Sequence, residues 1–107
     1  MKIELLYFDG CPNFLPTLNL VNEVVAELGL DAKIVTTPVR TQQEARAREF
    51  LGSPSVRVDD TDIEIHRPGN PHYTVSCRVY QDESGMSGIP SRQLLRAALL
   101  SRQSPGR

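Results

Sequence analysis

The sequence holds very little of what a metal site or a disulfide-stapled fold requires. Its 107 residues include two cysteines, Cys11 and Cys77, and two histidines, His66 and His72. Two cysteines are too few for the framework of a small secreted domain. Together the four side chains form no cluster at a zinc-ligand spacing, and the histidines fall in an irregular stretch where surface positions are expected. We therefore predict no metal and no cofactor, and two thiols available for chemistry.

The chain also lacks a charge excess and a long apolar run. Its 12 Lys and Arg stand against 13 Asp and Glu, and a formal net charge of −1 argues against a nucleic-acid partner. No apolar stretch approaches the roughly 20 residues of a membrane span, and no secretory leader follows Met1. We expect a cytoplasmic protein with one domain, residues 1–100, and a polar tail, residues 101–107, that frays.

The clearest pattern lies around Cys11. An apolar run over residues 3–8 predicts a buried central strand, and apolar residues at helical spacing up to Leu28 predict a helix. Gly10 allows a sharp turn between them, so Cys11 stands at the carboxyl end of the strand and the amino end of the helix. Exposed N–H groups and the positive end of the helix dipole favour a thiolate there. Cys11 is therefore the main candidate for chemistry.

The remaining elements predict an α/β domain in the order β-α-β-α-β-β-α. Gly29 ends the first helix, Thr41 begins the second and Ser91 begins the last. The other expected elements are a strand over 32–37, a helix reaching the stop at Gly52, a third strand starting at Arg57, a strand over 73–80, and a loop over 81–88.

The last predicted strand alternates in polarity. Val75, Cys77 and Val79 share one face, and Arg78 and Tyr80 share the other. A cysteine between valines is most often a small buried hydrophobe, and an arginine on the opposite face is most often solvated. The alternative for Cys77 is a functional partnership with the first cysteine, and the two possibilities remain open.

Four motifs carry a resemblance to a known family: Phe8-Asp9-Gly10-Cys11-Pro12-Asn13, Gly52-Ser53-Pro54-Ser55-Val56, Cys77-Arg78-Val79-Tyr80 and Gly88-Ile89-Pro90-Ser91. With the element order, they resemble the thioredoxin superfamily, and within it small bacterial thioredoxin-like proteins with a single active-site cysteine. Some of those are labelled alkylmercury lyase-like. The resemblance implies a four-stranded mixed sheet in the order 2-1-3-4 with helices on both faces.

The resemblance also implies a site. Cys11 matches the attacking cysteine, and Pro54 matches a proline that is normally cis and packs beside the reactive sulfur. The residues expected to position an incoming sulfur are Pro12, Asn13, Ser53 and Pro54. Backbone groups there would present an edge to a partner chain. The expected partner is a small thiol or a protein disulfide.

The chain departs from the usual motif at Phe14, which stands where the resolving cysteine is normally found. Cys11 is therefore expected to act as a monothiol, released by an external thiol or by Cys77. Thiol–disulfide exchange is the leading prediction. The alternatives are soft-metal chemistry, with mercury or an organomercurial bound by both thiols, and a non-catalytic interaction module.

Overall fold

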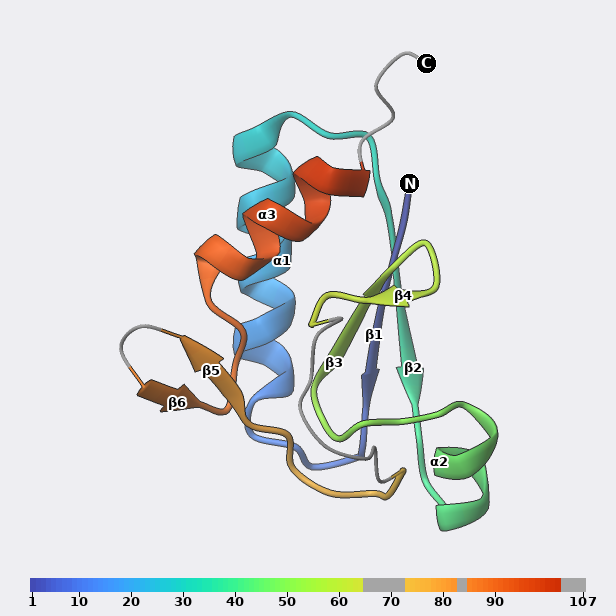
Figure 1. Ribbon diagram of the computed structural model, residues 1–107. Helices are drawn as coiled ribbons and strands as arrows, with labels where there is room; N and C mark the ends of the chain where they lie inside the picture. The colour runs from blue at the N-terminus through green and yellow to red at the C-terminus, as the bar shows by residue number, and fades with distance from the viewer. Residues whose placement is uncertain (65–72, 83–84, 103–107) are drawn as a thin grey trace.

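The sheet is built outward from β1 (Lys2–Tyr7), as the computed structural model in Figure 1 shows; it describes residues 1–64, 73–82 and 85–102. β1 pairs in parallel with β2 (Lys33–Pro38) and antiparallel with β3 (Ser55–Val58), where Leu5 lies opposite Val56. β4 (Thr61–Asp62) adds antiparallel to β3. The strand order β2-β1-β3-β4 confirms the predicted mixed sheet with its first strand inside.

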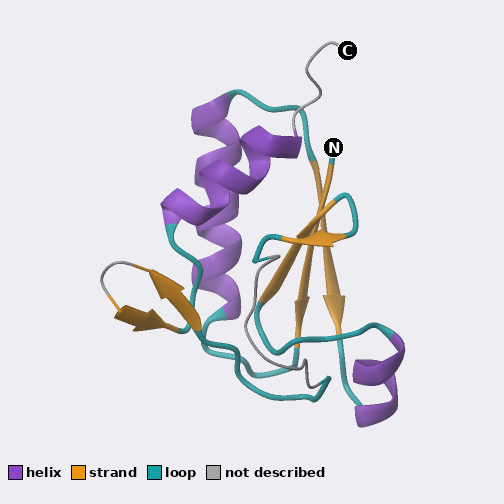
Figure 2. Cartoon of the chain, in the orientation of Figure 1, coloured by secondary structure: helices purple, strands orange, loops and turns teal. Residues whose placement is uncertain are grey.

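Helices pack on both sides of β1, because alternate side chains of this strand point to opposite faces of the sheet. Ile3 and Leu5 pack in the larger core with α1 (Phe14–Leu28) and α3 (Arg92–Arg102), which lie side by side in Figure 2. Leu6 packs in a smaller core with Ala45 of α2 (Gln42–Ala47) and with Phe50. The predicted two-sided arrangement is confirmed.

The predicted helix caps are confirmed. Gly29 follows α1 in the left-handed conformation, with a φ of 65°, as a residue without a Cβ readily does. The hydroxyl of Thr41 accepts a hydrogen bond of 3.0 Å from the N–H of Glu44 at the start of α2. The hydroxyl of Ser91 accepts one of 3.0 Å from the N–H of Leu94 at the start of α3.

The second helix is shorter than predicted, because it ends at Ala47 and not at Gly52. Glu49 adopts a left-handed φ of 52°, which breaks the helical path. The guanidinium of Arg57 on β3 donates to the carbonyls of Arg48 and Glu49, at 2.5 and 2.9 Å. A side chain from the sheet thus satisfies carbonyls that a longer helix would have used.

The fourth strand of the sheet was wrongly predicted. It is formed by Thr61–Asp62 and not by residues 73–80. Asp59 and Asp60 both take left-handed φ values, 49° and 70°, so the chain reverses immediately after β3 and pairs with it. Residues 73–79, here called the 73–79 segment, make one isolated parallel bridge instead, between Cys77 and Ser53.

The predicted loop over residues 81–88 contains a small hairpin, β5 (Tyr80–Asp82) paired with β6 (Gly85–Ser87). α3 continues to Arg102, past the point where the tail was expected to begin. The rest of that tail, residues 103–107, and both histidines lie outside the described residues. Among the helices that are described, none has the length and apolar character to cross a membrane.

Candidate functional site

Cys11 lies in the bend between β1 and α1, as predicted. Gly10 makes the turn with a φ of 87°. The N–H of Cys11 donates to the carbonyl of Phe8 at 3.2 Å, and its carbonyl accepts from the N–H of Phe14 at 3.3 Å. The side chain is largely covered, since the residue is 9% exposed. The thiol is therefore fixed just ahead of the helix, with a narrow opening to solvent.

The amino end of α1 is not neutralised by its own residues. Asn13 is the N-cap, yet its side chain makes no capping hydrogen bond to a described residue, and the first helical turn contains no acidic residue. The Asn13 amide lies instead against Gly88, where an added Cβ would come within 2.3 Å of the amide nitrogen. Pro12 is exposed between Asn13 and Cys11. The positive end of the helix dipole is thus available to an anion beside the thiol.

The Ser53–Pro54 peptide bond is cis, as the resemblance implies, and both residues are buried. Phe8 connects this segment with Cys11 by backbone contacts. Its N–H lies 3.4 Å from the hydroxyl of Ser53, which accepts the hydrogen bond, and its carbonyl accepts from Cys11. The carbonyl of Pro54 accepts a buried hydrogen bond of 2.6 Å from the hydroxyl of Tyr80. Two stretches of chain more than 40 residues apart meet here, as predicted.

Ser53, which contacts Phe8 through its hydroxyl, contacts the chain around Cys77 through its backbone. The N–H of Ser53 donates to the carbonyl of Ser76 at 2.7 Å, and the carbonyl of Ser53 accepts from the N–H of Arg78 at 2.9 Å. These two bonds flank Cys77 and hold it opposite Ser53. Both cysteines are described, and both are free thiols.

The predicted burial is inverted from Cys77 to Tyr80, whereas Val75 is partly buried against the smaller core. Cys77 is exposed and Val79 is 52% exposed, whereas Arg78 and Tyr80 are each only 2% exposed. The alternation itself was correct, so the error concerns which face turns inward. Arg78 and the adjoining Tyr80 pack against the start of β3 because they find polar partners there, the hydroxyl of Ser55 and the carbonyl of Pro54.

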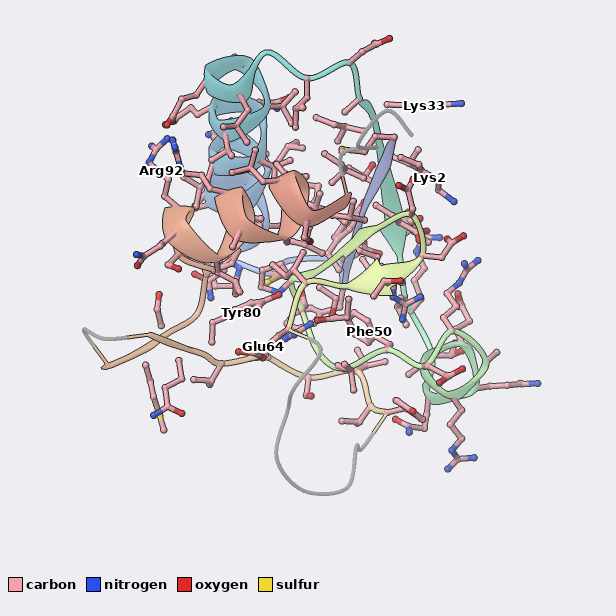
Figure 3. All side chains as sticks on the ribbon, turned by 45° about the horizontal axis from the view of Figure 1, so that its top comes forward. Lys2, Lys33, Phe50, Glu64, Tyr80 and Arg92 are labelled. Atoms are coloured by element: carbon pink, nitrogen blue, oxygen red, sulfur yellow. The ribbon has the colours of Figure 1, made fainter. Side chains whose placement is uncertain are left out.

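Arg78 is held by a cluster of polar groups and an aromatic ring. Its guanidinium pairs with both carboxylate oxygens of Asp62 at 2.7 Å, and with Glu64 at 3.2 Å. It also donates to the hydroxyl of Ser55 at 3.1 Å and lies 4.3 Å from the ring centre of Tyr80. Figure 3 shows Glu64 and Tyr80 close together below α3, with Phe50 further toward α2. The cluster fixes the 73–79 segment to the edge of the sheet.

These surroundings act on Arg78 in opposite directions. Burial lowers the pKa of Arg78, but the hydrogen bond to Asp62 and the nearby negative charges raise it above that of a free guanidinium. The arginine therefore stays charged. Nothing in the sequence indicated this cluster beyond the shared phase of Arg78 and Tyr80, because the carboxylates lie 14 and 16 residues away.

A charged pair lies near Cys11 on the outer surface. The Nε of Arg40, which follows β2, donates to a carboxylate oxygen of Asp9 at 3.0 Å, and both side chains are exposed. The pKa of Arg40 is raised, mainly by this hydrogen bond and secondly by the negative charge of Asp9. Asp9 was interpreted as a turn residue, and Arg40 was not predicted. The guanidinium of Arg40 thus neutralises the Asp9 carboxylate, two residues before Cys11 in the chain.

Two further observations bear on the class of protein. Within residues 1–64, 73–82 and 85–102, no three His, Cys, Asp and Glu side chains gather so that they could hold a metal ion. No family model matches the chain, and comparisons with curated proteins and with solved structures gave no match. The fold and the site define an α/β protein with a four-stranded mixed sheet and a cysteine between its inner strand and first helix.

Proposed function

We propose that this chain is a thioredoxin-like monothiol protein that performs thiol–disulfide exchange through Cys11. The observation that carries the proposal is the link through Phe8, whose two backbone groups join Cys11 to Ser53, next to the cis bond of Pro54. The sheet order and the position of the thiol before α1 support the same assignment.

The proposed reaction begins with the thiolate of Cys11. It attacks one sulfur of a disulfide, forms a mixed disulfide and expels the second sulfur as a thiolate, which takes a proton from solvent. An external thiolate then attacks the substrate sulfur and regenerates Cys11. Alternatively, Cys77 attacks the sulfur of Cys11, releases the substrate as a thiol and leaves a disulfide between the two cysteines.

The surroundings suit the first step. The uncompensated amino end of α1 favours the negative charge of the attacking sulfur, and Pro12 and Asn13 form its rim. Arg40 pairs with Asp9, so the carboxylate two residues before Cys11 is compensated by a cation. For the second step, exposed Cys77 is accessible beside Ser53.

The proposal is tested by reacting the reduced protein with glutathione disulfide and following its intact mass. Cys77→Ser should give a stable adduct of one glutathione on Cys11. The unaltered chain should gain the same adduct and then lose it to an external thiol or to a disulfide between its cysteines. Cys11→Ser should leave only a slow reaction of Cys77, at the rate of an ordinary exposed thiol.

Two outcomes would contradict the proposal and favour its alternatives. If Cys77→Ser forms no adduct, the chain fits a non-catalytic interaction module. If, in addition, inorganic mercury binds one-to-one to the unaltered chain and binding is lost in both variants, soft-metal binding by the two thiols is favoured.

A further inference from the structure

We propose that the substrate of Cys11 is a small, compact disulfide and not an extended polypeptide, because the chain's own 73–79 segment occupies the backbone edge beside the thiol. This inference rests on the proposed function and narrows it. It also revises the expectation that the residues around Pro54 present an open edge to a partner chain.

An extended polypeptide is held at a protein surface mainly by backbone groups that have no partner within the protein. Near Cys11 those groups are taken. The N–H of Ser53 donates to Ser76 and its carbonyl accepts from Arg78, at 2.7 and 2.9 Å. Both backbone groups of Phe8 are also bonded, to the Ser53 hydroxyl and to the Cys11 N–H. An incoming chain therefore finds these positions already paired.

The occupying segment is tightly held. At Gly52 the backbone of Arg78 passes so close that an added Cβ would lie 2.9 Å from the Arg78 Cβ and 3.1 Å from its Cα. In addition, the guanidinium of Arg78 is paired with Asp62. The hydroxyl of Tyr80 is bonded to the carbonyl of Pro54. Displacing the segment would break these buried interactions as well as the two bonds to Ser53.

Access to the thiol favours a compact substrate for a second reason. Cys11 is 9% exposed, and Asn13, two residues further along the chain, packs so closely against Gly88 that an added Cβ there would lie 2.3 Å from the Asn13 amide nitrogen. A bulky folded partner would find little exposed surface of the thiol to approach. A small disulfide needs only the narrow opening.

The test uses Cys77→Ser, so that only Cys11 reacts, and three mixed disulfides that share the leaving group 5-thio-2-nitrobenzoate. The first carries N-acetylcysteine amide, the second a short extended peptide with a central cysteine, and the third the same peptide N-methylated on both sides of that cysteine. The rate at which Cys11 attacks each disulfide is measured from release of the coloured thiolate. Each rate is divided by the rate at which free glutathione attacks the same disulfide, which corrects for the intrinsic reactivity of that disulfide.

The corrected peptide rates should not exceed that of the small disulfide, and N-methylation should change the peptide rate less than twofold. The assignment is overturned if the peptide reacts faster by roughly tenfold or more and N-methylation removes the gain, the pattern expected when two backbone hydrogen bonds form. Release from none of the three overturns the proposed function and this inference with it, so the two failures are distinguishable.

Amide hydrogen exchange provides a readout that does not depend on reactivity. The N–H groups of Ser53 and Arg78 should be protected in the free protein and equally protected with excess of the reduced peptide. Protection of Arg78 that falls when peptide is added would mean that the segment gives way to a substrate chain, which also overturns the inference.

Discussion

Gly52, which precedes Ser53 and cis-Pro54, packs closely against the 73–79 segment at Arg78. Its φ of 114° is a conformation that L side chains rarely adopt, and the backbone of Arg78 lies within contact distance of its missing Cβ. Two separate constraints therefore favour glycine here. They can be separated because Gly85, in the β5–β6 hairpin, has a φ of 119° and no described atom within 4 Å of an added Cβ.

Gly52→Ala should lower the free energy of unfolding more than Gly85→Ala does. Both changes introduce backbone strain of about 1–3 kcal/mol. Only Gly52→Ala also forces a methyl group against Arg78, which adds about 1–3 kcal/mol of overpacking. Urea denaturation of the two variants measures the difference. Equal losses would show that the close approach at Gly52 does not constrain the native state.

At the scale of single residues, the sequence predicted position better than burial. Cys11 was placed correctly because a buried strand, a glycine turn and a helix follow one another locally. The predicted alternation is observed over residues 77–80, but there hydrophobicity indicated the wrong face. Arg78 is buried because two carboxylates and a tyrosine surround it, and such distant partners leave no local pattern.

Among the elements, the 73–79 segment is held by side chains more than by a ladder of backbone bonds. It has one bridge to Ser53, and its anchor is the Arg78 guanidinium, whose side chain is fully buried. Arg92 offers a comparison, since it pairs with Glu23 and Glu27 but is 45% exposed and lies on the side of the helices away from the sheet (Figure 3).

Arg78→Met should lower the free energy of unfolding by about 3–5 kcal/mol, because it removes the buried cation that pairs with the partly buried carboxylate of Asp62. Arg92→Met should cost less than about 1 kcal/mol, as expected for an exposed pair. Thermal or urea unfolding checks both values, and hydrogen exchange at the Ser53 N–H should quicken only in the first variant. A similar cost for the two changes would mean that the cluster does not anchor the segment.

The longer elements were predictable and the shortest strands, β4, β5 and β6, were not. β1, α1, β2 and α3 carry an apolar pattern and recognisable ends over six or more residues. β4, β5 and β6 have two or three residues each, too few for a periodicity to be read. Their existence depends on tight turns and on neighbouring strands.

Across the whole molecule, three distant stretches converge on one end of the sheet. Cys11 follows β1, Ser53 and Pro54 precede β3, and Cys77 lies in the 73–79 segment. The sheet order and the helices on both faces were implied by the resemblance and are confirmed. Membership of the thioredoxin superfamily stays a prediction. So does the reactivity of the thiol.

The most direct measurement is the rate of glutathione disulfide with Cys11 in folded Cys77→Ser, compared with a peptide of residues 6–16 in the same buffer. The peptide carries the same neighbours without the fold. We predict that the folded protein reacts faster, by roughly tenfold, because the amino end of α1 stabilises the attacking thiolate. A folded-state rate equal to or below that of the peptide would show a merely buried thiol and would contradict the proposed function.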